Sequence, residues 1–500
     1  MSERLTFCVP ITESEQGFLA GVRRDYGDIK IVKKSLDARK KGDIKWVYTI
    51  DAGETKSEEE PFFKAKNPPQ TVVIVGSGPA GLFCAERLIR HGIKPIILER
   101  GKSVTERKKD IEFFIKTGIL KSESNIQFGE GGAGTFSDGK LNTQTKNPLN
   151  KSVFSTFVKY GAPKEIEYLQ KPHIGSDNLI TVVKNMRNFI EENGGKIMFS
   201  TALSDLEIEN GEISAVITSS GQKIETNDLV LAIGHSARDT FEMLYRKGIA
   251  IEQKDFAVGF RIEHLQEEIG KAQYGKDYPL LPPADYKLVS HASERSVFTF
   301  CMCPGGEVMP ATSEEGGVVV NGMSEYARNK TNANSAVIAQ VKKEDFKSDY
   351  PLAGILFQRE LERKAYALGG GEYHAPVQRV GDYLKRRETQ KFTSVIPSYA
   401  RGVTAVDLSA LLPKNLDEAI RKALPDMAKR LKGFDSEDAV LTGVESRTSS
   451  PVRIVRDENK QSVTVKGVYP AGEGAGYAGG ITSSAVDGIS VAEIIASKYI

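Results

Sequence analysis

The stretch TVVIVGSGPAGLFCAERLIRHGIKPIILE, residues 71–99, decides the fold of this chain. It begins with an apolar run typical of a strand buried on both faces, and it ends with a second such run. Between the two runs a glycine-rich turn leads into a helical pattern, so the order is strand, helix, strand. We therefore predict an α/β fold centred on a three-layer, Rossmann-like nucleotide-binding domain.

The turn after the first strand has the spacing G-x-G-x-x-G at Gly76, Gly78 and Gly81. Gly76 permits a tight turn, Gly78 lets the backbone approach a pyrophosphate, and Gly81 lets the helix pack closely on the strand. Pro79 suits a first helical turn that faces phosphates, and Glu99 is placed to bind ribose hydroxyls. A glycine turn that only packs is the alternative. We assign the following residues to a dinucleotide: Gly76, Ser77, Gly78, Pro79, Ala80, Gly81, Glu99 and Arg100.

Two later loops favour FAD over NAD, because the flavin end of the longer dinucleotide needs contacts beyond the first βαβ unit. The apolar strand in 228–240 runs into Gly234, where the backbone can come close to a cofactor. The segment PAGEGAGYAGG, residues 470–480, opens the last helix and offers its N–H groups to an electron-rich ring edge. The ligands predicted in these loops are Gly234, Gly472, Glu473, Gly480 and Ile481.

Together these motifs resemble the glutathione-reductase-type FAD fold, in which a Gly-Asp pair usually stands where this chain has Gly472-Glu473. More closely, the segments SLDARKK, FGEGGAGTFSDGKL, FCMCPGG, VNGMSEYARN, GVESRTSSPVRI and PAGEGAGYAGG are similar to the bacterial FAD-dependent dehydrogenases, also called NAD(FAD)-utilising dehydrogenases. This resemblance spans nearly the whole chain. It implies bound FAD and leaves the substrate open.

The resemblance also implies that the glycine-rich stretch 125–141 lies along the isoalloxazine ring. Its backbone contacts would come from Gly132, Ala133, Gly134 and Thr135, and its polar groups from Ser137, Asp138 and Lys140. A surface loop is the alternative.

Arg107 lies on a basic segment, where it could reach the pyrophosphate as a bidentate partner or face solvent. His264 and Arg447 each flank a glycine-bounded turn and are candidate pocket residues without an assigned role.

Cys301 and Cys303 lie on a predicted strand, and a period of two would point both side chains to one face, opposite Phe300 and Met302. Such a pair could relay electrons as thiols. Against this, a C-x-C disulfide closes a small strained ring, and buried cysteines commonly only pack. Packing is the reading that we favour.

Composition excludes several classes of protein. Lys and Arg number 68 and Asp and Glu 66, so the charge of +2 gives no basis for binding nucleic acid or a membrane surface. Four cysteines fit neither a disulfide framework nor a metal site, so we expect no metal and a reducing compartment. The chain has no signal-peptide pattern and no long apolar span, so we expect a cytoplasmic protein.

We expect three units: a small N-terminal α+β domain over 1–67, an FAD-binding domain over 68–255 and 440–500, and an inserted α+β substrate or cap domain over 256–439. The charged, proline-containing stretch before the βαβ unit places the first boundary near Pro61–Gln70.

The predicted function is an FAD-dependent dehydrogenase or reductase that transfers a hydride through flavin N5 to or from an unknown small molecule. NAD(P)H as a transient reductant stays open, since no second βαβ nucleotide motif follows the first. The alternatives are a flavin monooxygenase, or a flavin-dependent RNA-modifying or partner-binding protein. Near-neutral charge argues against the RNA-binding alternative.

Overall fold

The computed structural model describes residues 3–53, 64–68, 71–141 and 146–499. Its central feature is a five-stranded parallel sheet with the order β22-β10-β4-β5-β6. The strands are β4 (Val72–Val75), β5 (Pro95–Leu98), β6 (Lys196–Met198), β10 (Asp228–Leu231) and β22 (Val468–Pro470). All four residues of β4 are buried because both faces of the sheet are covered, as the apolar run predicts. The α/β class is therefore confirmed.

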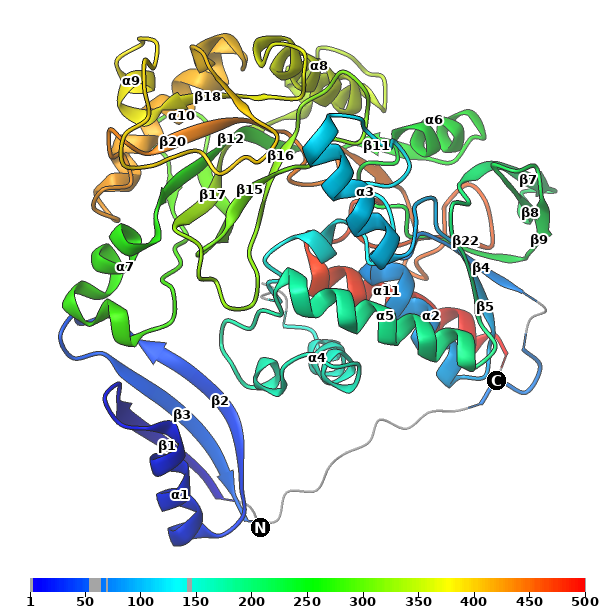
Figure 1. The fold of residues 1–500 in the computed structure, drawn as a ribbon. Helices are drawn as coiled ribbons and strands as arrows, with labels where there is room; N and C mark the ends of the chain where they lie inside the picture. The colour runs from blue at the N-terminus through cyan, green and yellow to red at the C-terminus, as the bar shows by residue number, and fades with distance from the viewer. Residues whose placement is uncertain (1–2, 54–63, 69–70, 142–145, 500) are drawn as a thin grey trace.

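Two different layers cover this sheet (Figure 1). On one face lie the helices α2 (Pro79–Arg90), α4 (Leu149–Lys159), α5 (Ser176–Glu192) and α11 (Ile481–Ser497). On the other face lie α6 (Arg238–Arg246) and the antiparallel sheet of β7 (Leu203–Glu209), β8 (Glu212–Thr218) and β9 (Lys223–Glu225). Helix α11 comes from the end of the chain and packs against α2, so both ends of this domain meet at one face.

The middle of the chain forms a second, seven-stranded sheet with the order β13-β14-β17-β12-β20-β18-β19. Its strands are β12 (Phe256–Leu265), β13 (Val289–Ser290), β14 (Val297–Cys303), β17 (Asn332–Val341), β18 (Ala375–Arg379), β19 (Val403–Ala405) and β20 (Val440–Glu445). The helices here are α7 (Gln266–Tyr274), α8 (Ala353–Leu368), α9 (Val380–Leu384) and α10 (Lys414–Ala428), beside a hairpin of β15 (Glu307–Pro310) and β16 (Val320–Met323).

Strand β20 shifts the expected domain boundary at residue 440. It pairs with β12 on one side and with β18 on the other, so it lies inside the seven-stranded sheet. Hydrogen bonding between strands far apart in the sequence decides this, and a local pattern cannot show it. The chain returns to the nucleotide-binding domain only after Glu445, through the ribbon of β11 (Ile251–Gln253) and β21 (Val452–Ile454).

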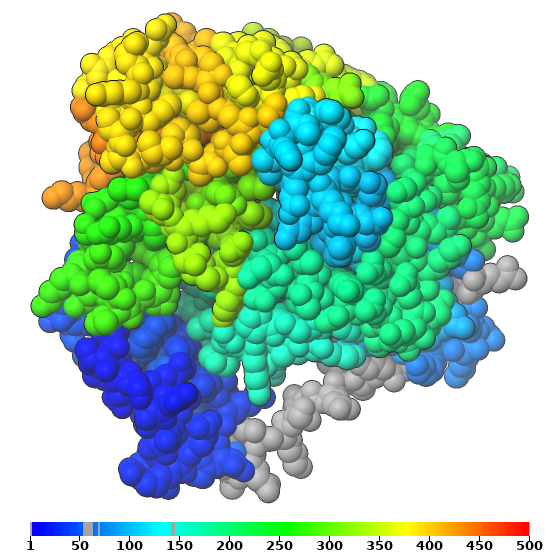
Figure 2. Space-filling view, viewed as in Figure 1, coloured from blue at the N-terminus to red at the C-terminus, as the bar shows by residue number. Residues whose placement is uncertain are grey.

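Helix α3 (Val104–Thr117) reaches from the nucleotide-binding domain to the inserted domain. Its Phe114 ring meets the ring of Tyr373 edge-on, with centroids 5.1 Å apart. Figure 2 shows this helix on the surface, in contact with the yellow and lime segments of the inserted domain. The two large domains are thus joined by side-chain packing as well as by the chain itself.

The N-terminal unit consists of β1 (Glu3–Pro10), α1 (Glu15–Tyr26), β2 (Ile29–Asp37) and β3 (Lys45–Ala52) around a small core of its own. The three strands form an antiparallel sheet in the order β1-β3-β2. Its edge strand β2 is bound to the main body, because Lys34 N donates to Tyr168 O (2.7 Å) and Gln170 N donates to Lys34 O (2.9 Å). Residues 61–63 and 69–70 of the boundary expected near Pro61–Gln70 lie outside the described residues.

Candidate functional site

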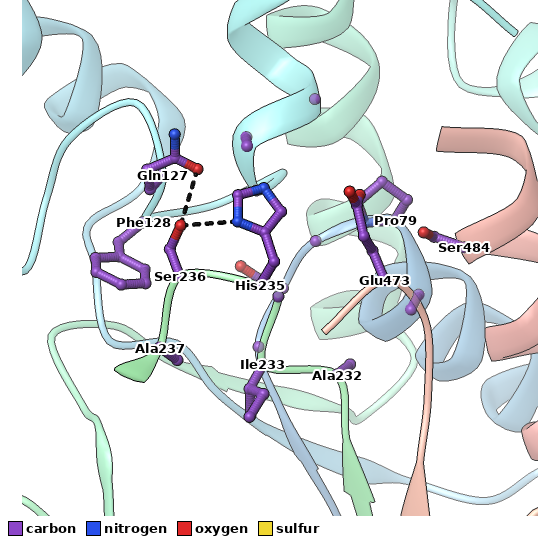
Figure 3. Close-up of a pocket in the computed structure, with 18 of the residues that line it drawn as sticks. Pro79, Gln127, Phe128, Ala232, Ile233, His235, Ser236, Ala237, Glu473 and Ser484 are labelled. Carbon is purple, nitrogen blue, oxygen red and sulfur yellow. Dashed lines mark hydrogen bonds between the residues drawn. The ribbon is translucent and has the colours of Figure 1, made fainter. Parts of the chain in front are cut away.

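A pocket of about 340 Å³ opens where the parallel strands β4, β5, β10 and β22 end. This is the position at which doubly wound sheets bind ligands, and the volume lies in the range of ligand pockets. Figure 3 shows that one side of the pocket comes from the loops after β4, β10 and β22. The inserted domain supplies the opposite side, with Phe300, Cys301, Asn321, Glu445 and Arg447.

The glycine turn after β4 is shaped by close backbone contacts. Gly76 has a φ of 99°, and a Cβ there would lie 2.3 Å from the carbonyl oxygen of Ala232. A Cβ on Gly81 would lie 1.9 Å from the carbonyl oxygen of Gly76. Gly78 differs, because its Cβ position faces the pocket and the nearest atom, Cα of Gly132, is 3.8 Å away. Of these three glycines, only Gly78 therefore leaves room for a ligand.

Two helices point their N-termini at the pocket. Helix α2 starts after Gly78 and helix α11 after Gly480, and no side chain of the described residues caps either one. The Cβ positions of Gly479 and Gly480 have no atom within 4 Å, so the start of α11 is open. Uncapped N–H groups with a positive dipole end suit a phosphate or another anionic group.

The carboxylate of Glu99 lines the pocket and is fully engaged with the surrounding loops. Its Oε2 accepts from Ser77 N (2.9 Å) and from Ser77 Oγ (2.6 Å). Its Oε1 accepts from Gly101 N (2.8 Å) and from Gly129 N (3.1 Å). Glu99 therefore holds three loops together. A ribose hydroxyl that binds Glu99 would have to share its carboxylate oxygens with these four donors.

Arg100 lies in the pocket wall, where its guanidinium pairs with Glu123 and Asp239 and stacks on the Phe128 ring at 4.2 Å.

The position of Arg107 corrects the prediction that it could reach a pyrophosphate. It does not line the pocket, since it is fully buried and donates to the carbonyl oxygens of Asn125, Ile126, Gly129, Glu130 and Gly132. These bonds hold the 125–132 loop, and the guanidinium is buried away from the pocket where a pyrophosphate would bind.

The loop 125–141 forms the pocket wall only in part. Gly132, Ala133 and Gly134 line it, at the start of a short 3₁₀ turn over Ala133–Phe136. Thr135 lies behind this wall with its side chain buried, which corrects the predicted contact. Ser137 and Lys140 also line the pocket. Asp138 is instead buried in an ion pair with Arg328.

The loop after β22 also differs in part from the prediction. Gly472 does not line the pocket, and its N–H donates to Oδ2 of Asp487 (2.8 Å). Glu473 does line it and lies beside Pro79 in the close-up (Figure 3). Burial raises the pKa of Glu473 to about 7, and Lys254 only partly opposes this effect. Gly480 and Ile481 line the pocket as expected.

A buried ion cluster supports the inserted-domain side of the pocket. Arg447 donates to both oxygens of Glu362 (2.9 and 2.7 Å), and the fully buried Arg238 donates to the same carboxylate (2.9 and 2.7 Å). Despite burial, these two arginines hold the pKa of Glu362 well below its usual range. Arg447 therefore lines the pocket while it is already paired with a buried carboxylate.

Loop 234–240 contributes His235 and Ser236, which the sequence analysis did not select. Ser236 Oγ lies 2.9 Å from Nδ1 of His235 and 3.3 Å from Oε1 of Gln127 (Figure 3). Burial, followed by the charges of Arg447 and Arg238, lowers the pKa of His235 to about 3. The imidazole is therefore neutral at physiological pH.

His264, a predicted pocket residue, is a correction. It is buried inside the inserted domain, where its Nε2 lies 2.8 Å from the carbonyl oxygen of Phe434 and its ring does not reach the pocket.

Sequence reasoning missed Glu445, a pocket residue that lies two residues before Arg447. Its Oε1 accepts from Arg261 (3.1 Å), while its buried Oε2 has no partner among the described residues. Burial raises the pKa of Glu445 to about 7.

The pocket residues fit FAD. The space at Gly78 and the two uncapped helix ends suit an anionic dinucleotide. In the parts of the chain that the structure describes, no cluster of His, Cys, Asp and Glu could hold a metal ion. Within the same parts, no helix combines the length and the apolar character that crossing a bilayer requires.

Comparisons with known proteins agree with an FAD-binding domain. Residues 70–112 match the family described as FAD binding domain, and residues 255–448 match the family described as FAD-dependent protein, C-terminal domain-like. A Clostridium beijerinckii protein, described as uncharacterized, is 46% identical over 95% of this chain and 94% of its own length.

Two solved structures resemble the chain only distantly. L-proline dehydrogenase from P. horikoshii is 14% identical, with a TM-score of 0.37 over 87% of this chain and 95% of that one. The flavin-dependent brominase Bmp2 is 13% identical, with a TM-score of 0.38 over 88% of this chain and 80% of that one.

Proposed function

The chain belongs to the same family of FAD-dependent proteins as its Clostridium beijerinckii relative, and from this premise we propose that it is an FAD-dependent dehydrogenase or reductase acting on a small molecule. One observation carries the proposal: a single pocket joins the glycine turn of a dinucleotide site to titratable side chains of a second domain. The first part suits cofactor binding and the second suits chemistry.

In this proposal the nucleotide-binding domain supplies backbone contacts. The N-terminus of α2 and the open position at Gly78 receive the pyrophosphate, and Glu99 and Arg100 lie toward the adenosine end. The N-terminus of α11, beginning at Gly480 and Ile481, faces the flavin and favours negative charge at the ring edge. These backbone contacts would orient the cofactor.

When bound, FAD supplies a hydride acceptor and donor at its N5 atom. Titratable side chains from both sides of the pocket would then control protons and water. Glu445 and Glu473 both have a pKa raised to about 7, so each can hold or release a proton near neutral pH. The inserted domain covers this part of the pocket, and Phe300 lies at its edge. The substrate would lie between these groups and the ring.

The test begins with the protein as purified. Its absorbance spectrum should show oxidised flavin, and acid release followed by chromatography should identify FAD in about equal amount to the chain. Anaerobic addition of NADH, NADPH and a panel of small hydride donors should then bleach the flavin with one of them. Flavin-free folded protein would contradict the proposal, and oxygen-dependent hydroxylation of a substrate would favour a monooxygenase instead.

A further inference from the structure

The segment Phe300–Cys303 breaks the regular geometry of β14. Phe300 pairs with Ala336 and Cys303 with Asn334, so one extra residue forms a bulge between them. Cys301 lies in this bulge with a φ of 42°, a conformation that is rare and costly for a residue with a side chain. The period of two predicted from the sequence therefore fails, and Phe300 and Cys301 both face the pocket.

This bulge places Cys301 where a reagent can reach it. Phe300 is 37% exposed and Cys301 is partly exposed, while Cys303 is fully buried directly behind them. The Sγ of Cys303 lies 3.4 Å from the carbonyl oxygen of Cys301. The pair thus has one accessible thiol and one protected thiol, the arrangement of an attacking and a resolving cysteine.

Two cations hold the bulge. Buried Arg261 donates to the carbonyl oxygen of Cys301 and lies 3.4 Å from the Sγ of Cys303. Lys140 donates to the carbonyl oxygen of Met302. The thiol of Cys303, together with these two positive charges, lowers the pKa of Cys301 to about 6, although burial opposes the shift. The pKa of Cys303 is raised by the same contact and by burial.

Acidic groups also face the cysteine pair. Asp138 lies on the loop that carries Lys140, and Glu473 lies across the pocket. Glu445 is bound to Arg261 through Oε1, while its buried Oε2 is unpartnered among the described residues and the side chain lines the pocket. An unpartnered carboxyl oxygen beside a thiol pair can accept and return a proton.

We propose that Cys301 and Cys303 are a dithiol that exchanges with disulfides of small molecules, with Cys301 attacking and Cys303 resolving. This goes beyond the proposed function, because the exchange needs no electrons from the flavin. Packing alone, the reading favoured by the sequence, explains neither the bulge nor the cations that hold it.

The exchange balances without another reagent. The Cys301 thiol gives its proton to the carboxylate of Glu445 and attacks one sulfur of the substrate disulfide, the substrate S–S bond breaks, and the leaving thiolate takes that proton from Glu445. Cys303 then gives its proton to Glu445 and attacks the sulfur of Cys301, the mixed disulfide breaks, and the second substrate thiolate takes this second proton from Glu445. Two electrons pass to the substrate, and a Cys301–Cys303 disulfide remains.

A C-x-C disulfide closes a small ring, so the bond formed is strained. Strained disulfides have the more oxidising potentials and are easily reduced. We therefore expect the dithiol to be the resting form and the disulfide to form only during exchange.

The test uses the FAD-containing protein in a Cys8→Ser background, because Cys8 is exposed on β1. The probe is 5,5′-dithiobis(2-nitrobenzoate), which releases one coloured thiolate at each displacement. The background protein should release two per chain and end with a mass lower by two hydrogens. Cys303→Ser should release one and keep the mixed disulfide, whereas Cys301→Ser should lose the fast reaction.

Lys140→Met provides a readout that packing would not change. Without this cation, the apparent pKa for alkylation of Cys301 by iodoacetamide should rise and exchange at neutral pH should slow several-fold. Release of only one thiolate by the background protein, or a fast reaction that survives in Cys301→Ser, would overturn the proposal. Flavin absorbance in each sample shows whether FAD is bound, so a failed exchange is distinguished from failure of the proposed function.

Discussion

The two walls of the pocket are built on different principles. The wall from the nucleotide-binding domain is mostly backbone. At Gly76 the Cβ position lies against the carbonyl oxygen of Ala232, and the backbones of Gly78 and Gly132 lie close to each other. Two uncapped helix ends complete this wall. The wall from the inserted domain consists of side chains such as Cys301 and Glu445. Space and N–H direction decide what the first wall binds, whereas charge and proton affinity decide what the second can do. The first wall should therefore be sensitive to added atoms and the second to changed charge.

The largest effect is expected where an added methyl group meets backbone. A Cβ at position 81 would lie 1.9 Å from the carbonyl oxygen of Gly76. The backbone can relieve this clash only by moving, which costs much folding free energy. We predict that Gly81→Ala yields little or no soluble folded protein. Gly21→Ala is the matched control, since Gly21 also lies in a helix and has no atom within 4 Å of its Cβ position. Circular dichroism and soluble yield measure both, and a stable Gly81→Ala protein would contradict the prediction.

The next effect lies in the charges behind the second wall. Glu362→Gln leaves the buried Arg238 and Arg447 without their shared carboxylate, which should lower the free energy of unfolding by about 3 kcal/mol at neutral pH. Exposed Glu360→Gln on the same helix should change it little. Urea unfolding measures both variants.

The pH dependence of this loss has a defined sign. Because the folded pKa of Glu362 is lowered, its stabilisation is present above its unfolded value of 4.5 and is lost as the pH falls below that value. The difference between wild type and Glu362→Gln should therefore shrink in acid. A difference that stays constant or grows would contradict the assigned ion cluster.

A smaller effect separates ligand binding from folding on the first wall. In Gly78→Ala the new Cβ would lie 3.8 Å from the nearest atom, Cα of Gly132, so the protein should fold. The methyl group would nevertheless occupy the expected path of the pyrophosphate, and the Kd for FAD should rise at least about tenfold, or ~1.4 kcal/mol. Fluorescence titration of the apoprotein with FAD measures this, beside Gly21→Ala. Unchanged affinity for FAD in the folded variant would mean that the pyrophosphate does not bind at this turn.

The sequence predicted the two walls unequally. The strand, turn and helix of 71–99 follow a local pattern, because glycine roles and helix ends depend on neighbouring residues. Arg107 was placed wrongly because its partners are carbonyl oxygens of a folded loop, which no pattern marks. Glu445 was missed since it becomes a pocket residue only through pairing of β20 with β12. The position of Cys301 depends on a bulge set by the register between β14 and β17.

The smallest effect concerns His235, the only histidine among the described residues that line the pocket. Burial and two arginines lower its pKa to about 3, so it should remain neutral across the range of about pH 5 to 8 in which histidines usually titrate. In the unfolded chain His235 binds a proton once the pH falls below its ordinary pKa of 6.5, whereas in the folded protein it stays neutral. This residue therefore lowers the free energy of unfolding as the pH falls below 6.5. In the NMR spectrum of the protein as purified, the ring Cε1–H resonance assigned with His235→Gln should not shift across this range. A midpoint within it would mean that His235 changes its charge near neutral pH, in addition to Glu445 and Glu473.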